Sequence, residues 1–563
     1  MTSLALRCAL LLSRYHWQRW EAYTDNPRAT QSELLLQILG KNQATAFGRD
    51  HGFGAIKTIA DYRKQVSIAD YERFRPYIER ARQGEKSVLT NEPVLMFTLT
   101  SGSTGEPKLI PVTESTRANH ARLTRLWYGR AFQDHPGSAA GKMFGLVGRI
   151  VEGYTAGGIP YGAASGLIYQ SSPGWIKRAN ALPYEIAEIQ DFQAKYYVAM
   201  RVAIEQDVTF LGTPNPSTIL RLVETADRFR DEIVKDVNDG SLSTRFELAP
   251  DVRAALSEKF SPNRIRARQL ERWSATAGRL SPIDYWPHLK LVGCWKGGSV
   301  GVRLKELANW FGDAVPTRDL GYMASEAQMS LPISDHGSAG ILAVDGNFYE
   351  FIPESEIAST NPIVLNCHEL EASGVYYVIL TTAAGLYRYD INDVIRVAGF
   401  LGETPLVEFQ RKGRDVTNIT GEKLHVNQVI HAMEQAQRAT GAAVRHFRAF
   451  ADVNESRYAF MVELDGPQPS AETLKRFVAE LDTRLCGLNV EYADKRKSGR
   501  LKAPTLCLMK AGWFERKTSA ALQAGARDIQ FKAQLLSAAA EDPNEISCTL
   551  EPVDSAAGSN RQN

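Results

Sequence analysis

The chain has 563 residues, of which 44% are hydrophobic and 23% charged, as is typical of a soluble globular protein with more than one domain. Its 66 lysines and arginines nearly balance 64 aspartates and glutamates, so no overall field recruits nucleic acid or an anionic membrane. The six cysteines lack the paired spacing of a zinc site or a disulfide framework, and we therefore expect a reducing, cytoplasmic setting.

The N-terminal part of the chain shows helical periodicity. Residues 5–14 are apolar, but Arg7 interrupts them and the amphipathic pattern continues through Trp17 and Trp20. We therefore predict a helix that caps the surface rather than a signal peptide. A second helix is predicted over 68–84, where a glycine ends it. No run reaches the roughly 18 apolar residues that a membrane span requires.

Short apolar strands alternate with helical segments in the middle of the chain. They are predicted over 143–147, 208–212 and 289–295, and this alternation is typical of βαβ units and a largely parallel sheet. A strand-rich block over 340–400 is predicted to be antiparallel.

Beyond about residue 413 the pattern is that of a separate α+β domain. The helix predicted over 474–485 has five apolar residues on one face, so it needs a sheet to cover, and these residues are Leu474, Phe477, Val478, Leu481 and Leu485. We predict an α/β fold with a large domain of mixed and parallel sheets over 1–412, a small C-terminal domain over 413–537 and a disordered tail over 538–563.

The stretch 98-TLTSGSTGEPKLIPVT-113 places hydroxyl side chains, two glycines and a lysine on one turn between two apolar runs. Gly102 and Gly105 allow successive N–H groups to point inward as a nest for an anion. Neighbouring hydroxyls and Lys108 add donors and a mobile positive charge. A polyphosphate would suit this loop, although it is not a Walker A loop.

A competing motif suggests a serine hydrolase. Residues 297-GGSVG-301 match the G-x-S-x-G nucleophile elbow and lie between a predicted strand and a predicted helix. Ser299 would be the nucleophile, Asp319 the acid, and His336 or His368 the base. This alternative leaves the hydroxyl-rich loop without a role, and short patterns of this kind occur often by chance.

Two further clusters add the parts of a nucleotide site. Residues 319-DLGYMASEAQMS-330 carry Tyr322, whose ring can stack on a purine, and Glu326, whose carboxylate can hold Mg²⁺ against phosphate oxygens. In 385-GLYRYDINDVIRV-397, Asp393 can accept the hydroxyls of a ribose. Together with the loop, these clusters indicate ATP.

The chain resembles the auxin-responsive (Gretchen Hagen) acyl acid amido synthetases, a branch of the adenylate-forming superfamily. The resemblance rests on 99-LTSGSTGEPKLIP-111, 321-GYMASE-326, 348-FYEFIP-353, 385-GLYRYDINDVIRV-397 and 421-GEKL-424. The loop alone would place only the superfamily, whereas F-Y-E-F-I-P combined with G-L-Y-R-Y is much more specific. The resemblance covers nearly the whole chain.

The resemblance implies roles for particular residues. Phosphate binding falls to Ser101, Ser103, Thr104 and Lys108, adenine binding to Gly298, Ser299 and Tyr322, and the remaining contacts to Ser325, Glu326 and Asp393. Arg411 opens the hinge before the small domain, and Lys423 and Lys532 are the lysines that this domain would bring to catalysis. ATP and Mg²⁺ are the implied cofactors, with Glu326 as the metal ligand.

Two departures from the family pattern affect these assignments. Asn392 stands where the family usually has glycine before the ribose-binding aspartate, and asparagine also tolerates left-handed backbone angles. The family's Q-Y-K-x-P-R ending is here 530-QFKAQL-535, which puts the role of Lys532 in doubt.

The implied reaction joins a small carboxylic acid to AMP and then transfers the acyl group to an amine, which we expect to come from an amino acid. Transfer to a thiol or hydroxyl, as in CoA ligases and ester-forming relatives, is the alternative within the superfamily. A catalytically silent ATP-binding protein is an alternative outside it. We expect a monomer that binds neither nucleic acid nor membrane.

Overall fold

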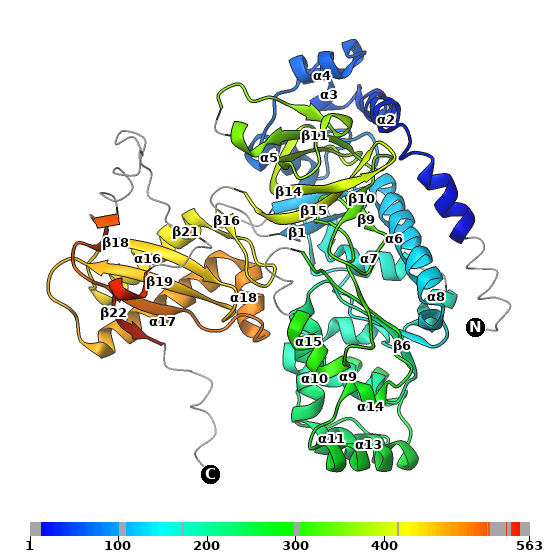
Figure 1. The fold of residues 1–563 in the computed structure, drawn as a ribbon, viewed down its shortest axis with the longest axis vertical. Helices are drawn as coiled ribbons and strands as arrows, with labels where there is room; N and C mark the ends of the chain where they lie inside the picture. Colours follow the sequence, from blue (N-terminus) through cyan, green and yellow to red (C-terminus); the bar gives the residue numbers. More distant parts are fainter. Residues whose placement is uncertain are drawn as a thin grey trace. The chain divides into compact units, whose positions relative to one another are not determined.

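The computed structural model describes residues 13–100, 108–171, 174–297, 304–357, 359–413, 416–514, 516–517, 536–537 and 542–551. The chain divides into two compact units, the larger comprising residues 1–99 and 109–411 and the smaller comprising residues 100–108 and 412–563. The larger unit contains three sheets and most of the helices, and the smaller unit a sheet with helices of its own (Figure 1). The α/β fold class that the sequence predicts is confirmed.

The N-terminal part is helical, as the sequence predicts. The described chain begins in a helix over residues 13–21, in which Trp17 and Trp20 are buried. The indole N–H of Trp20 donates to Asp345 at 2.9 Å, so this helix is fastened to the larger unit. The helices that follow are α2 (Pro27–Asn42), α3 (Ala46–Asp50), α4 (Ile59–Gln65) and α5 (Tyr71–Arg82).

A four-stranded parallel sheet forms the first α/β layer of the larger unit. Its order is β3 (Lys142–Gly145), β6 (Val208–Gly212), β7 (Leu291–Gly293) and β8 (Thr317–Arg318). All three pairings are parallel, as the alternation of strands and helices predicts. The long helix α6 (Glu114–Asp134) buries Leu123 and Trp127 in a cluster shared with Phe210 of β6.

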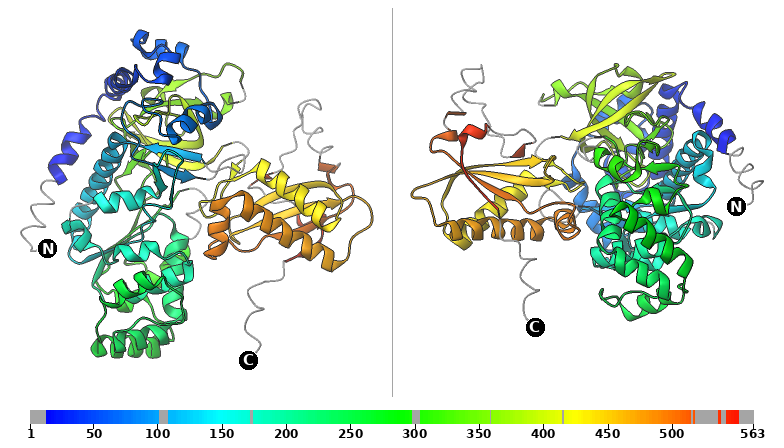
Figure 2. Two further views of the ribbon diagram at one scale, coloured as in Figure 1. Left: turned by 180° about the vertical axis from the view of Figure 1, so that it is seen from behind. Right: turned by 60° about the horizontal axis from the view of Figure 1, so that its bottom comes forward.

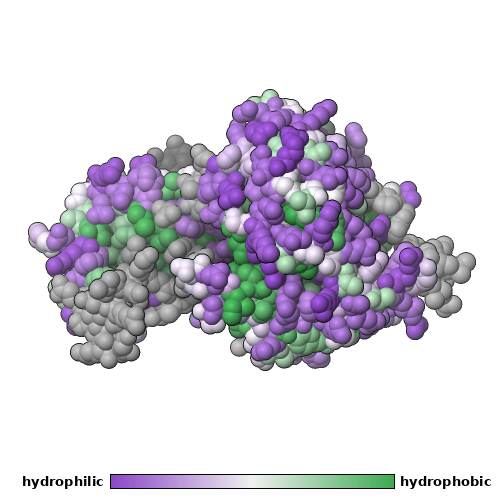
Figure 3. All heavy atoms as spheres, turned by 90° about the horizontal axis from the view of Figure 1, so that it is seen from above, coloured by the Kyte–Doolittle hydropathy of each residue, from purple (hydrophilic) through white to green (hydrophobic). Residues whose placement is uncertain are grey.

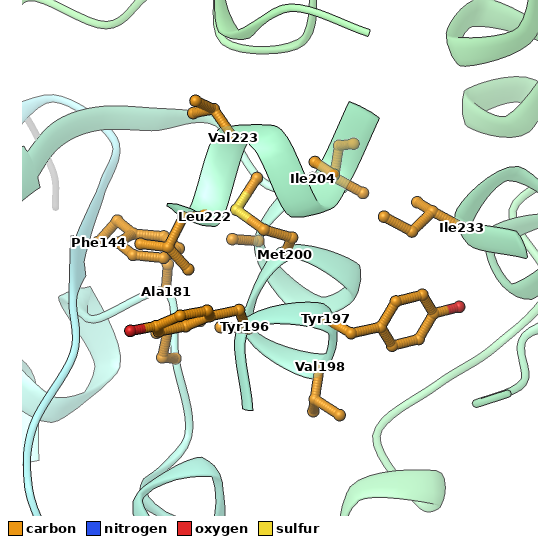
Figure 4. Packing of buried hydrophobic residues seen from close by; sticks show 14 of the residues in the cluster. Phe144, Ala181, Tyr196, Tyr197, Val198, Met200, Ile204, Leu222, Val223 and Ile233 are labelled. Carbon is orange, nitrogen blue, oxygen red and sulfur yellow. The ribbon is translucent and has the colours of Figure 1, made fainter. Parts of the chain in front are cut away.

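Helices pack around this sheet to form an extensive apolar core. Figure 4 shows α9 (Phe192–Ala203) and α10 (Pro216–Arg228) contributing Tyr197, Met200 and Leu222 to it, with Phe144 from β3. The other helices of this unit are α7 (Ala164–Ser171), α8 (Gly174–Ala179), α11 (Arg230–Asp239), α12 (Pro250–Ser257), α13 (Arg264–Ala277), α14 (Pro282–Tyr285) and α15 (Leu304–Phe311). Since this core lies beside β6 and β7, it fixes the strand ends that carry the site.

The strand-rich block forms a seven-stranded sheet. Its order is β12 (Leu365–Asn366), β11 (Phe348–Pro353), β13 (Val375–Thr381), β14 (Tyr389–Leu401), β15 (Thr404–Lys412), β10 (Gly340–Leu342) and β9 (Ser330–Pro332). The pairs β9–β10, β10–β15, β11–β12, β11–β13 and β13–β14 are all antiparallel, which confirms the prediction for this block.

The two most specific family motifs meet in this sheet through buried charge. Arg388 of G-L-Y-R-Y donates to Glu350 of F-Y-E-F-I-P at 2.8 Å, and Arg63 of α4 donates to the other oxygen of Glu350 at 2.8 Å. The side chains of Glu350 and Arg388 are 1% and 6% exposed. These motifs therefore include a structural ion pair, which holds the chain that leads into β14.

The hydroxyl-rich loop connects two neighbouring strands, as predicted. Strands β1 (Met96–Thr100) and β2 (Lys108–Val112) belong to a sheet of order β2-β1-β5-β4, with β5 at Pro160–Gly162 and β4 at Gly153–Tyr154. The loop between β1 and β2, residues 101–107, lies outside the described residues.

The smaller unit is a sheet covered by helices. Its five-stranded sheet has the order β21 (Leu536–Ser537), β18 (Val444–Asp452), β19 (Arg457–Leu464), β20 (Thr505–Met509) and β22 (Ile546–Leu550). Figures 1 and 2 show α16 (Val426–Thr440) and α17 (Ala471–Leu488) side by side along it. All five apolar residues predicted for one face of α17 are buried in this core. The unit also contains α18 (Val490–Lys497) and a hairpin of β16 (Val416–Thr417) and β17 (Leu424–His425).

The prediction of a disordered tail over 538–563 is wrong for residues 546–550. These residues form β22, an edge strand that pairs with β20 from Leu506↔Leu550 to Met509↔Ile546. The prediction rested on small, polar and acidic composition, but Ile546 and Leu550 pack against apolar clusters of the smaller unit while the backbone pairs with β20.

Hydrophilic residues cover most of the face shown in Figure 3, and hydrophobic residues gather in patches among them. No helix of the described residues is both long and apolar enough to cross a membrane.

Candidate active site

The carboxyl ends of the parallel strands bring two of the predicted motifs together. Gly212, Gly293 and Arg318 are in register at the ends of β6, β7 and β8. The segment after β7 begins the turn expected at adenine, and the segment after β8 begins 319-DLGYMASE-326. Because ligands of open α/β sheets bind beyond the carboxyl ends of the strands, this edge is the natural place for the site.

Tyr322 lies buried at this edge and is 7% exposed. Its backbone N–H donates to Ser330 Oγ at 2.9 Å, and its hydroxyl donates to Asp393 Oδ2 at 2.7 Å. Burial and the nearby Asp393 carboxylate hold the pKa of Tyr322 well above its usual value, so the phenol remains a donor. The structure thus joins two residues that are 71 positions apart in the sequence.

Phe409 of β15 packs against the Tyr322 ring. Their ring centroids are 5.7 Å apart with an interplanar angle of 26°. A Cβ atom on Gly297 would lie 3.1 Å from the Phe409 carbonyl oxygen, so the turn after β7 closely approaches the same strand. The turn, Phe409 and Tyr322 therefore form one continuous aromatic and backbone surface of the kind that can receive a planar base.

Glu326 places a carboxylate in the same region. It is 9% exposed, and its Oε1 accepts a long hydrogen bond of 3.5 Å from the hydroxyl of Tyr389. Its Oε2 is buried and has no hydrogen-bond partner among the described residues. Burial and the Glu326 charge hold the pKa of Tyr389 well above its usual value. A buried carboxylate oxygen without a partner is suited to a hard cation, which prefers oxygen ligands.

The turn before Asp393 has the left-handed backbone that the sequence allows. Asn392 has φ +56°, and its N–H donates to Asp390 Oδ1 at 2.8 Å. Asparagine thus replaces the usual glycine without loss of the turn, as predicted. Arg388 also has a positive φ of +48°, and its buried ion pair with Glu350 keeps it there.

Other predicted residues have definite places in the structure. Lys108 is half-buried at the start of β2, and Ser325 is half-buried beside Glu326. Arg411, near the end of β15, is exposed and forms an ion pair with Glu354. Ser101, Ser103, Thr104, Gly298, Ser299 and Lys532 lie outside the described residues.

Lys423 belongs to the smaller unit and directly precedes β17. Its N–H donates to Glu491 Oε2 at 3.0 Å, and its carbonyl accepts from Asn489 Nδ2 at 2.8 Å. The preceding Glu422 is buried and accepts from the N–H groups of Ile419 and Thr420. The 421-GEKL-424 turn is therefore held by side chains on both sides of Lys423.

The hydrolase arrangement is not found at Asp319. Its carboxylate accepts the N–H of Lys296 at 2.5 Å and the N–H of Gly321 at 2.6 Å, and the Gly297 N–H also donates to it. His336 is exposed, and its backbone N–H is capped by Ser334. Asp319 therefore organises backbone rather than orienting a catalytic histidine.

The sequence motifs predict no role for Tyr389 or Phe409, and they place Asp319 only in the hydrolase alternative. Tyr389 stands inside a quoted motif, so its position was a usable signal. Phe409 carries no such signal, because its contact with Tyr322 joins β15 to the turn after β8, and these segments are far apart in the sequence.

Comparison with known proteins identifies the family. The GH3 family N-terminal domain matches residues 16–317, the central domain residues 340–412 and the C-terminal domain residues 427–541. A jasmonoyl–L-amino acid synthetase of Nicotiana attenuata, JAR4, is 24% identical over 539 residues, which cover 92% of each chain. An indole-3-acetic acid-amido synthetase of Arabidopsis thaliana, GH3.10, is 24% identical over 88% of this chain and 90% of its own.

A solved structure has the same fold. The acyl acid amido synthetase GH3.15 matches with a TM-score of 0.64 at 20% identity, over 94% of this chain and 96% of its own. The three family domains follow one another along most of the sequence, in agreement with the resemblance inferred from the motifs. This chain belongs to the GH3 family.

Proposed function

We propose that this protein is an ATP-dependent acid–amino acid ligase, which activates a carboxylic acid as an acyl adenylate and transfers the acyl group to an amine. One observation carries the proposal: Tyr322, Asp393, Glu326 and Tyr389 converge through the hydrogen bonds Tyr322–Asp393 and Tyr389–Glu326. These residues combine an aromatic ring, two carboxylates and a buried oxygen without a partner, which are the groups that a nucleotide and its cation need.

Residues from several segments of the chain divide the nucleotide between them. Tyr322 offers its ring to the adenine, and we assign Gly298 and Ser299 to adenine binding as well. Asp393 accepts from the ribose hydroxyls, either beside its hydrogen bond to Tyr322 or in its place. The hydroxyls of Ser101, Ser103 and Thr104, with Lys108 and Ser325, donate to the phosphates.

Glu326 is the residue that would hold Mg²⁺. Its unpartnered Oε2 fits an oxygen-ligand cation, and Tyr389 fixes the other carboxylate oxygen. When bound, the cation supplies charge neutralisation at the phosphates.

The proposed reaction has two steps. In the first, a carboxylate oxygen of the acid attacks the α-phosphorus of ATP, and the bond to the β-phosphate breaks to release pyrophosphate. In the second, the amine nitrogen attacks the acyl carbon, AMP leaves with the carboxylate oxygen, and the nitrogen loses a proton. Negative charge develops on the α-phosphate in the first step, and a donor that meets this charge lowers the barrier of that step. We assign this role to Lys532. We assign Lys423 to the second step.

The chain after Arg411 provides both of these lysines. We propose that residues 413–537 act as a small mobile domain and that residues 411–415 act as its hinge, because two successive reactions at one site need different groups. The free cysteines of the described residues suit a reducing compartment, and we propose that the protein works in the cytoplasm.

One of the relatives is a jasmonoyl–L-amino acid synthetase, and another is an indole-3-acetic acid-amido synthetase. We propose an acid of this small organic class and an amino-acid acceptor for this chain. The test is ATP–pyrophosphate exchange driven by pooled carboxylic acids, followed by mass spectrometry of products made with pooled amino acids. Acid-dependent exchange with an amide product is expected. Exchange with only a thioester or ester as product would show that the acceptor is a thiol or a hydroxyl rather than an amine. The absence of exchange with every acid would refute the proposed ligase activity.

A further inference from the structure

Asp319 fastens together the two turns that follow β7 and β8. It is 3% exposed, its Oδ2 accepts from the N–H of Lys296, and its Oδ1 accepts from the N–H of Gly321. Gly297 adds a third backbone N–H to the same carboxylate. One side chain thus satisfies donors from both turns, and none of the three donors is a side chain.

Two tryptophans complete the connection. The indole N–H of Trp295 donates to the Gly321 carbonyl at 3.1 Å, and that of Trp127 donates to the Asp319 carbonyl at 2.8 Å. Gly321 has φ +93°, and a Cβ atom there would lie 2.3 Å from the Ser330 carbonyl oxygen. The backbone immediately before Tyr322 is therefore fixed from several directions.

We infer that Asp319 is the positioning residue that holds the turn at 296–297 and the ring of Tyr322 in register to receive the adenine of ATP. This inference rests on the proposed function, which gives both turns to the nucleotide. Asp319 itself is buried, and its carboxylate accepts backbone N–H groups from both turns. Its contribution is that the binding surface exists before ATP arrives.

The Asp319→Asn variant tests this role because it changes one oxygen to an NH₂ group. An asparagine can still accept at one oxygen, but its amide nitrogen would face a backbone N–H that donates, so at least one turn is released. A buried donor left without a partner is costly, and we expect the Kd for ATP to rise by about tenfold or more. Trp295→Phe removes one hydrogen bond of the same connection and should raise the Kd in the same direction by a smaller factor.

Asp236→Asn is the matched control. Asp236 is 4% exposed and likewise accepts from a backbone N–H, that of Ser243 at 2.7 Å, as well as from the Tyr197 hydroxyl at 2.6 Å. It lies on α11, in the helical part of the larger unit. A purely structural loss should therefore lower the melting temperature of both Asp→Asn variants, whereas only Asp319→Asn should weaken ATP binding.

The measurement is calorimetric titration of the full-length protein with ATP in excess Mg²⁺, beside thermal unfolding of each variant. A raised Kd in Asp319→Asn and Trp295→Phe, with Asp236→Asn within about twofold of wild type, supports the inference. A Kd for ATP in Asp319→Asn equal to that of the wild type, or a Kd raised to the same extent in Asp236→Asn, overturns the inference. If Asp319→Asn does not fold, Trp295→Phe alone decides by the same comparison. A wild-type protein that binds no ATP would instead refute the proposed function.

Discussion

The buried ion pair between the two family motifs gives a prediction whose size follows from the structure. In Glu350→Gln, Arg388 would keep its charge and its hydrogen bond of 2.8 Å to the Val66 carbonyl, but it would lose its anionic partner. Removing one partner of a buried pair costs about 3–5 kcal/mol. The Glu350 and Arg388 side chains are 1% and 6% exposed, so solvent can do little to compensate, and we expect a loss in this range.

Arg63→Gln is the comparison within the same network. Arg63 donates to the other oxygen of Glu350 at 2.8 Å, but its side chain is 27% exposed. Water and salt screen the partly exposed Arg63 guanidinium, and Glu350 would keep its buried partner Arg388, so the loss of Arg63 should cost about 1 kcal/mol. The two variants therefore remove charge from one network at two very different degrees of burial.

Denaturant unfolding followed by tryptophan fluorescence measures both free energies. All of the nine tryptophans except Trp513 belong to the larger unit, so the signal reports mainly the unit that holds this network. A cost below about 1 kcal/mol for Glu350→Gln, or an equal cost for Arg63→Gln, would show that burial does not set the value of this ion pair.

Three other predictions concern the site. Tyr389→Phe should change the free energy of unfolding by less than about 1 kcal/mol, because its hydrogen bond to Glu326 is long, while acid-dependent pyrophosphate exchange falls clearly; unchanged exchange would contradict a role for Tyr389. Burial raises the pKa of Asp319 from 3.8 to about 6, so the folded state binds more protons than the unfolded state between these values. The stability due to Asp319 should therefore be greatest below about pH 4 and decline as the pH rises toward 6, and urea unfolding across this range should show a flatter dependence in Asp319→Asn. Lys532→Ala should lower exchange by about 10² or more, whereas Lys423→Ala should spare exchange and slow amide release; wild-type exchange in both variants would exclude the smaller unit from the first step.

Local physics explains what the sequence determined by itself. The five apolar residues of α17 recur at helical spacing, and any fold that keeps this helix must bury that face. Asparagine is one of the few residues other than glycine that tolerate a positive φ, and Asn392 adopts one. The short apolar strands separated by helices likewise specified a parallel sheet, since parallel neighbours need a crossover between them.

The tertiary structure decided which distant groups meet and what each one does there. Tyr322 and Asp393 could be named from their motifs, but their mutual hydrogen bond and the packing of Phe409 depend on how β9, β14 and β15 are ordered in one sheet. Asp319 looked like a catalytic acid in the sequence, where only its residue type is visible. In the fold its oxygens are taken by backbone N–H groups from two turns. The chemistry of a carboxylate is set by its partners, and here those partners come from the turns after β7 and β8, strands that only the folded sheet places side by side.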